Sequence, residues 1–117
     1  SIAKIDRYLK HIKLITQQNN CKLLVMYVPG QIEISKPEHI AYYPDHVNIR
    51  DTTIYDLNKP NDIISALCSK HNINLFDTEK TLSQHPVQPV YFPESLHWNS
   101  EGHKVIAGSL SNRINID

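Results

Sequence analysis

The 117-residue sequence has no surplus of either charge, no long apolar run and few cysteines. Twelve Lys and Arg balance twelve Asp and Glu, which argues against a nucleic-acid-binding module because such modules carry a clustered basic surplus. The longest apolar run, Leu23 to Val28, is far shorter than the ~20 residues that a membrane-spanning helix requires, so no membrane span is predicted. The opening residues show no basic-then-apolar pattern of a signal peptide.

The two cysteines, Cys21 and Cys68, are too few and too far apart for a zinc knuckle or a disulfide framework. Each lies beside or within a segment of apolar periodicity, so we expect two buried free thiols. The histidines form no recognisable metal set, because His97 and His103 are six residues apart and ligands on one helix face are three or four apart. We predict neither a metal site nor a cofactor.

The overall amino-acid composition is typical of a folded domain. Hydrophobic residues make up 40% of the chain and charged residues 21%, which are ordinary values and argue against disorder. A chain of this length can form one hydrophobic core, so residues 1–117 are predicted to be a single domain.

Two helix-then-strand segments predict an α/β fold. A helix ending at Asn19–Asn20 is predicted to precede a strand between Cys21 and Pro29, whose near-continuous apolar run is typical of a strand buried on both faces. A second helix opening at Asn58 and a second strand over Asn72–Asp77 repeat the pattern. The apolar residues of the first helix recur at spacings of three and four and are expected to form its buried stripe: Ile2, Ile5, Leu9, Ile12 and Ile15.

These alternating elements, with a final helix capped by Asn99, predict a three-layer α/β/α fold with a parallel sheet. Only two firm strands are found where such a sheet needs about five, so the chain is expected to be the C-terminal portion of the fold. The irregular segment from Gly30 to Asn58 is long enough to be functional or locally helical. Its Tyr42 and Tyr43 are candidates for lining a sugar groove, with ordinary loop packing as the alternative.

The most specific pattern in the chain lies between Tyr91 and His103 and reads Tyr-Phe-Pro-Glu-Ser-Leu-His-Trp-Asn-Ser-Glu-Gly-His. Its His97-Trp98-Asn99 and Gly102-His103, followed by Val105-Ile106-Ala107, resemble the C-terminal catalytic block of the SGNH (GDSL-type) hydrolase superfamily. The likeness is nearest to the branch of bacterial polysaccharide O-acetyltransferases and acetylesterases. It implies an α/β/α fold, ester hydrolysis or acetyl transfer, an acylated carbohydrate substrate and an extracytoplasmic or cell-envelope location.

The resemblance also implies roles for individual residues. A serine hydroxyl needs a neutral imidazole as base, and a carboxylate orients that imidazole. His97 is the implied base, and Glu94, three residues before it, is the implied acid. Ser95 stands two residues before His97, where the acetyltransferase-like branch often has aspartate, and this alternative leaves the site without a carboxylate. Trp98 is a candidate substrate wall, with packing under the loop as the alternative.

The family's nucleophile motif is missing from these residues. Gly30, Gly102 and Gly108 are followed by Gln, His and Ser, so no Gly-Asp-Ser occurs, and Gly-x-Ser-x-Gly is missing too. We therefore expect the chain to be the C-terminal part of a larger hydrolase and to be inactive alone. The alternative is a non-catalytic carbohydrate-binding or protein-interaction domain descended from that fold.

Half a sheet would leave an open strand edge along Leu23 to Val28. In the resembled fold this edge pairs with a first strand that these residues do not contain. We expect the edge to pair with the missing N-terminal part of the domain or with another copy of the chain, or to be covered by the N-terminal helix.

Overall fold

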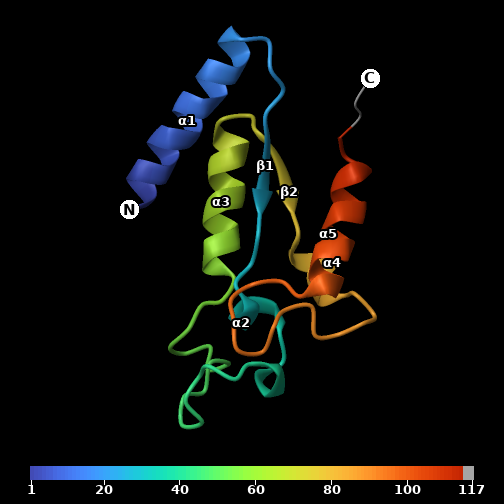
Figure 1. Ribbon diagram of the computed structural model, residues 1–117. Coiled ribbons are helices and arrows are strands. Elements are labelled where there is room, and N and C mark those ends of the chain that lie inside the picture. Colours follow the sequence, from blue (N-terminus) through green and yellow to red (C-terminus); the bar gives the residue numbers. More distant parts are fainter. Residues whose placement is uncertain (115–117) are drawn as a thin grey trace. The chain divides into compact units, whose positions relative to one another are not determined.

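The computed structural model describes residues 1–114, which form two compact units (Figure 1). The first unit comprises residues 1–27 and 58–77, and the second comprises residues 28–57 and 78–114. The first contains, in chain order, α1 (Ile2–Gln18), β1 (Leu24–Tyr27), α3 (Lys59–Lys70) and β2 (Asn74–Asp77). The second contains α2 (Gln31–Ile34), a short 3-10 helix (Pro37–His39), α4 (Glu79–Ser83) and α5 (Ser100–Ser111).

The first unit is built on a parallel pair of strands. β1 and β2 lie side by side, with Leu24 opposite Asn74 and Tyr27 opposite Asp77. Within residues 1–114 these two strands form the whole sheet, so the mixed α/β class and the parallel pairing are confirmed. Both helices of this unit pack with the strands in one hydrophobic cluster, made of Leu9, Cys68 and Ile73 with Leu23, Val25, Ile64, Leu67 and Leu75 around them.

α1 docks through a face that the sequence pattern did not identify. Of the five residues in the expected apolar stripe only Leu9 is buried, so the predicted stripe is wrong at its other positions. Polar contacts add to the packing of Leu9: Asp6 Oδ2 accepts a hydrogen bond from Lys70 Nζ at 2.8 Å, and its Oδ1 lies 2.6 Å from His71 Nε2. Lys13 Nζ also donates to Asn72 O at 2.9 Å. No helix within the described residues combines the length and apolarity that crossing a membrane takes.

Asparagines turn the chain after both long helices of this unit. Asn20 has φ 54° and Asn72 has φ 52°, the left-handed conformation that asparagine tolerates better than most residues. The helix stop predicted at Asn19–Asn20 is therefore confirmed.

The two cysteines lie in different environments. Cys68 is buried among the apolar residues of α3, and burial raises the pKa of its thiol. Cys21 is exposed, so the expectation that both thiols are buried is wrong. The cause is local: Cys21 directly follows the turn at Asn20, before the chain enters the packed strand.

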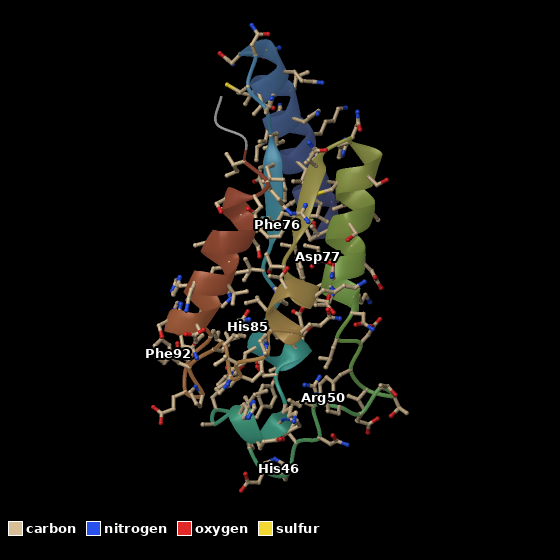
Figure 2. The ribbon with its side chains drawn as sticks, turned by 90° about the vertical axis from the view of Figure 1, so that its right-hand side faces the viewer. His46, Arg50, Phe76, Asp77, His85 and Phe92 are labelled. Carbon is tan, nitrogen blue, oxygen red and sulfur yellow. The ribbon has the colours of Figure 1, made fainter. Side chains whose placement is uncertain are left out.

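The second unit has its own core, formed where α4 and α5 meet the chain between them. Leu82, Val90, Tyr91 and Ile106 are buried together, and Ile34 and Trp98 pack against them. The segment from Gly30 to Leu57 contains only short helical turns, as expected of an irregular segment. Side chains stabilise it from within: Gln31 Nε2 donates to His39 O at 3.1 Å, and the Arg50 guanidinium donates to Ser35 O (Figure 2).

Substituting Asp6 by asparagine tests the polar docking of α1. The hydrogen bonds from Lys70 and then His71 lower the pKa of Asp6, so its carboxylate stabilises the fold above its usual pKa of about 3.9. This contribution is lost as the pH falls through the lowered pKa. We expect Asp6→Asn to lower the urea midpoint at pH 7 and to show a smaller loss of stability on acidification than the wild type.

The matched control is Asp45→Asn, because Asp45 is exposed and makes no hydrogen bond or ion pair among the described residues. Hydrogen exchange should also speed up in α1 of Asp6→Asn and not in Asp45→Asn. Equal effects of the two substitutions would show that the Asp6 contacts do not hold the helix.

Candidate functional site

The loop that carries the predicted site is closed at its base like a hairpin. Tyr91 and Trp98 form an isolated antiparallel bridge, and Asn99 N donates to Val90 O at 3.0 Å. One step further out, Phe92 N donates to His97 O at 3.1 Å. The backbone on both sides of the tip is thereby fixed.

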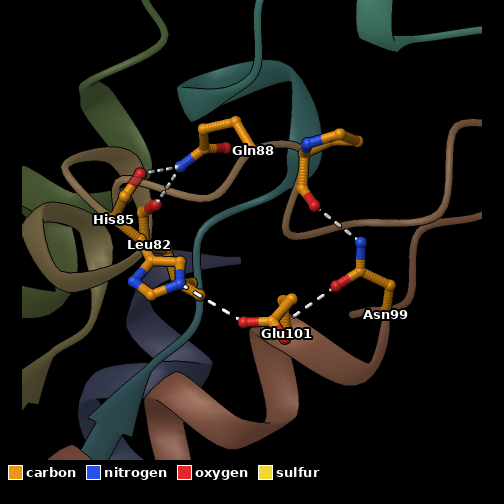
Figure 3. Close-up of polar contacts among 7 residues, drawn as sticks. Leu82, His85, Gln88, Asn99 and Glu101 are labelled. Atoms are coloured by element: carbon orange, nitrogen blue, oxygen red, sulfur yellow. Dashed lines mark hydrogen bonds and ion pairs between the residues drawn. The ribbon is translucent and has the colours of Figure 1, made fainter.

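Asn99 fastens this loop to the start of α5 (Figure 3). Its Oδ1 accepts a hydrogen bond from Gly102 N at 3.0 Å, which confirms the predicted N-cap. Its Nδ2 donates to Pro89 O at 2.6 Å, so the same amide group holds the residue that precedes Val90. Gln88 extends the attachment toward α4, because its Nε2 donates to Leu82 O at 2.8 Å.

Gly102 allows the loop to lie directly on α5. A Cβ atom added at this position would come within 2.3 Å of Val90 O and 2.9 Å of Trp98 Cβ. No side chain fits there, because one contact is with backbone that cannot move without breaking the loop. The glycine of the sequence pattern is thus a steric requirement.

Tyr91 ties the loop to the start of the Gly30–Leu57 segment. Its ring is buried, and its hydroxyl donates to Pro29 O at 2.5 Å. Burial raises the pKa of Tyr91 to about 12. The neutral hydroxyl is therefore a fixed donor, and the carbonyl of Pro29 is satisfied by it.

The predicted base and acid both lie at the solvent-exposed tip. The side chains of His97 and Glu94 are exposed, and no hydrogen bond or ion pair joins them within residues 1–114. Ser95, the alternative to Glu94, contacts His97 through the backbone: its Oγ accepts a hydrogen bond from His97 N at 3.2 Å. The structure brings these residues into one short loop and leaves the imidazole free to accept a partner.

The predicted substrate-binding tyrosines adjoin this loop. Ala41 N donates to Pro93 O at 2.8 Å, which places the neighbouring Tyr42 and Tyr43 beside the tip. Their rings are 5.5 Å apart and tilted by 48°. Tyr42 is the more exposed of the two, and partial burial followed by the neighbouring Tyr43 raises its pKa.

Trp98 lies at the inner end of the loop. Its indole packs against the core of the second unit, and its Nε1 is shielded from solvent. The ring meets His103 edge-on at 5.5 Å between centroids. These contacts favour packing under the loop, whereas Phe92, which directly precedes the tip in the sequence, is exposed (Figure 2).

A second histidine–carboxylate pair was missed by the sequence analysis. His85 Nε2 lies 3.5 Å from Glu101 Oε2, and this nitrogen is shielded from solvent (Figure 3). The pair borders a cavity of about 510 Å³, which is also lined by Val87, Lys104, Val105 and Ser109. The sequence gives no sign that these two residues are in contact, because they are far apart along the chain. Glu101 is also explained without His85, since an acidic residue in the first turn of α5 stabilises the helix dipole.

Comparison with known proteins finds no family model that matches the chain and no curated protein that matches its sequence. Within residues 1–114, no three His, Cys, Asp or Glu side chains gather as a metal ion would require.

Substituting Gly102 by alanine tests the close approach of loop and helix. The added Cβ would overlap Val90 O, so we expect a loss of about 1–3 kcal/mol in the free energy of unfolding. Gly108→Ala is the matched control in the same helix, because nothing lies within 4 Å of its added Cβ. Removing that mid-helix glycine should stabilise the chain by about 0.5–1 kcal/mol. Effects of the same sign in urea unfolding would contradict the steric role of Gly102.

Alkaline titration followed by tyrosinate absorbance tests the environment of Tyr91. The chain has six tyrosines, and we expect one transition near the pKa of about 12, which Tyr91→Phe removes. Because this pKa is raised above that of the unfolded chain, its contribution to stability is complete below about pH 10 and is lost as the pH rises toward 12. If Tyr91→Phe instead removed a transition near pH 10 and left one near pH 12, the hydroxyl would not be buried.

Proposed function

We propose that this chain is the histidine-bearing part of an SGNH-like serine esterase or O-acyltransferase, which acts on ester-linked acyl groups such as O-acetyl groups of polysaccharides. The observation that carries the proposal is the position of His97. His97 is an exposed residue on a loop whose backbone is fixed by hydrogen bonds on both sides of the tip. The loop directly precedes α5, whose N-cap is Asn99. A general base requires this combination of a fixed backbone and a free ring nitrogen.

The proposed chemistry assigns one step to each residue. A serine outside these 117 residues attacks the ester carbonyl, and His97 takes its proton. His97 then returns the proton to the leaving oxygen, and water or a sugar hydroxyl completes the transfer by the reverse path. Glu94 stands three residues before His97 on the same exposed tip, and in this proposal its carboxylate orients the imidazole.

The same proposal accounts for the aromatic residues beside the tip. Tyr42 and Tyr43 would present ring faces to the sugar that carries the acyl group. The hydrogen bond from Ala41 to Pro93 supports this role, because it holds the tyrosines next to the loop of His97.

The proposal also implies that the sheet of the whole domain has more strands than β1 and β2. β1 pairs with β2 along one edge, and among the described residues no strand pairs with its other edge. In the whole domain a strand from the nucleophile-bearing part would pair there, and further helices would complete three layers.

A non-catalytic binding domain remains the second candidate. Two observations favour it: the sequence contains no Gly-Asp-Ser, and the side chains of Glu94 and His97 are not joined. In this case the tyrosines and the loop would bind carbohydrate without cleaving an ester.

The test is fluorophosphonate labelling of the longest natural protein that contains this sequence, together with its intact mass. A fluorophosphonate reacts with a serine that a neighbouring histidine activates. We expect labelling on a serine outside these residues and a fall of about 10⁶-fold in the labelling rate with His97→Ala. Glu94→Gln should lower the rate, whereas Ser95→Ala should leave it nearly unchanged.

Two histidine variants serve as controls. His46→Ala changes an exposed histidine of the Gly30–Leu57 segment and should label like the wild type. His85→Ala removes the second histidine–carboxylate pair and should also label normally. If His85→Ala abolished labelling and His97→Ala did not, the base would be His85. A mass of 13.5 kDa with no labelling would favour the binding domain.

A further inference from the structure

Phe92 lies directly opposite His97 in the closed loop of the second unit. Tyr91 and Trp98 form the antiparallel bridge, so the next residue toward the tip is Phe92 on one side and His97 on the other. A hydrogen bond of 3.1 Å from Phe92 N to His97 O joins the two residues. Residues that face each other in this way have Cβ atoms about 5 Å apart.

The side chains of Phe92 and His97 lie on the exposed side of the loop. Successive side chains of an extended chain point to opposite sides, so the bridge pair and the next pair face in opposite directions. The bridge pair is covered, because Tyr91 is 1% exposed and Trp98 packs against the core. The next pair is open, with Phe92 exposed to 52% and His97 exposed as well (Figure 2). The phenyl ring and the imidazole therefore share one solvent-facing surface.

The backbone of Phe92 is fixed although its ring is exposed. Its N–H donates to His97 O, and its carbonyl accepts a hydrogen bond from Ser95 N at 3.2 Å. The following residue is held too, because Pro93 O accepts a hydrogen bond from Ala41 N at 2.8 Å. An apolar ring on a fixed backbone loses little conformational freedom when a ligand packs against it, which favours binding.

We propose that Phe92 is a specificity-determining residue that recognises the alcohol part of the ester, with its ring packed against the apolar C–H face of the sugar. This inference rests on the proposed function, in which His97 returns a proton to the leaving oxygen. That oxygen must then lie within hydrogen-bond reach of the imidazole, and the carbon atoms bonded to it lie beside the side chain that faces His97. The acyl chain lies on the far side of the carbonyl carbon, so Phe92 does not select it.

The chemistry of a phenyl ring determines which feature of the alcohol it recognises. The ring has no hydrogen-bond donor or acceptor, so it gains free energy only by removing apolar surface from water. A pyranose ring presents a broad face of C–H groups for such a contact, whereas ethanol presents only two carbon atoms. Phe92 therefore favours esters of ring-sized alcohols over esters of small ones.

Steady-state consumption of two acetates by the longest natural protein that contains this sequence tests the proposal. Methyl glucoside monoacetate and ethyl acetate share the acyl group and differ in the alcohol. We expect Phe92→Ala to raise KM for the sugar acetate about tenfold with kcat nearly unchanged, because the ring binds substrate and transition state alike. For ethyl acetate, kcat/KM should stay within about twofold of the wild type.

Two variants serve as controls for the loss of the ring. Phe92→Tyr keeps an aromatic ring and should keep the wild-type KM for the sugar acetate. Val87→Ala removes an apolar side chain of matching exposure, 51%, from the same unit and should leave the kinetics with both acetates unchanged.

Fluorophosphonate labelling checks that Phe92→Ala leaves the reacting groups intact. The leaving group of this probe is fluoride, which is too small to contact the ring, so the variant should label at the wild-type rate. Varying the acyl group tests the other side of the ester. The ratio of kcat/KM between methyl glucoside monoacetate and its monobutanoate should be the same in Phe92→Ala as in the wild type.

Three results would overturn the inference and leave the proposed function standing, because the wild type labels in each of them. The first is a wild-type KM of Phe92→Ala for the sugar acetate. The second is an equal loss of kcat/KM with the sugar acetate and with ethyl acetate. The third is a changed ratio between monoacetate and monobutanoate. A wild-type protein that neither labels nor consumes either acetate would overturn the proposed function and this inference together.

Discussion

The second unit depends on the close contact between the loop that begins at Val90 and the first turn of α5. Three hydrogen bonds of Asn99 reach both sides of this contact, and the missing side chain of Gly102 makes room for it. The N-cap, the loop closure and the core around Tyr91 all meet at this point. A change here would loosen the helix start and the loop together, because the hydrogen bonds of Asn99 join the two directly.

This constraint explains why two histidine–carboxylate combinations in one unit differ. His85 and Glu101 are held close together beside a cavity; both side chains are partly exposed, and the Nε2 atom of His85 is shielded from solvent. His97 and Glu94 have a fixed backbone and free side chains. The first arrangement suits a structural contact between loop and helix. The second suits an imidazole that completes its site with groups from another segment, which is the role the proposed function gives it.

Features of the fold that depend on residues close together in the sequence could be predicted from the sequence. The left-handed Asn20 and the N-cap Asn99 follow from what an asparagine side chain can do within a few residues of its own backbone. The parallel pairing of the strands follows from their apolar runs and the helix between them. The docked face of α1 did not follow, because Asp6 and Lys13 find their partners on α3 and its following turn, and apolar periodicity carries no information about those partners. The pairing of His85 with Glu101 is hidden for the same reason.

The account rests on His97 acting as a base toward a serine from outside these residues. The most direct test is a crystal structure of the longest natural protein containing this sequence, after reaction with a fluorophosphonate. The account predicts an adduct on a serine Oγ with a His97 ring nitrogen within about 3 Å of it. An adduct with His97 pointing away, or with His85 in that place, would contradict it.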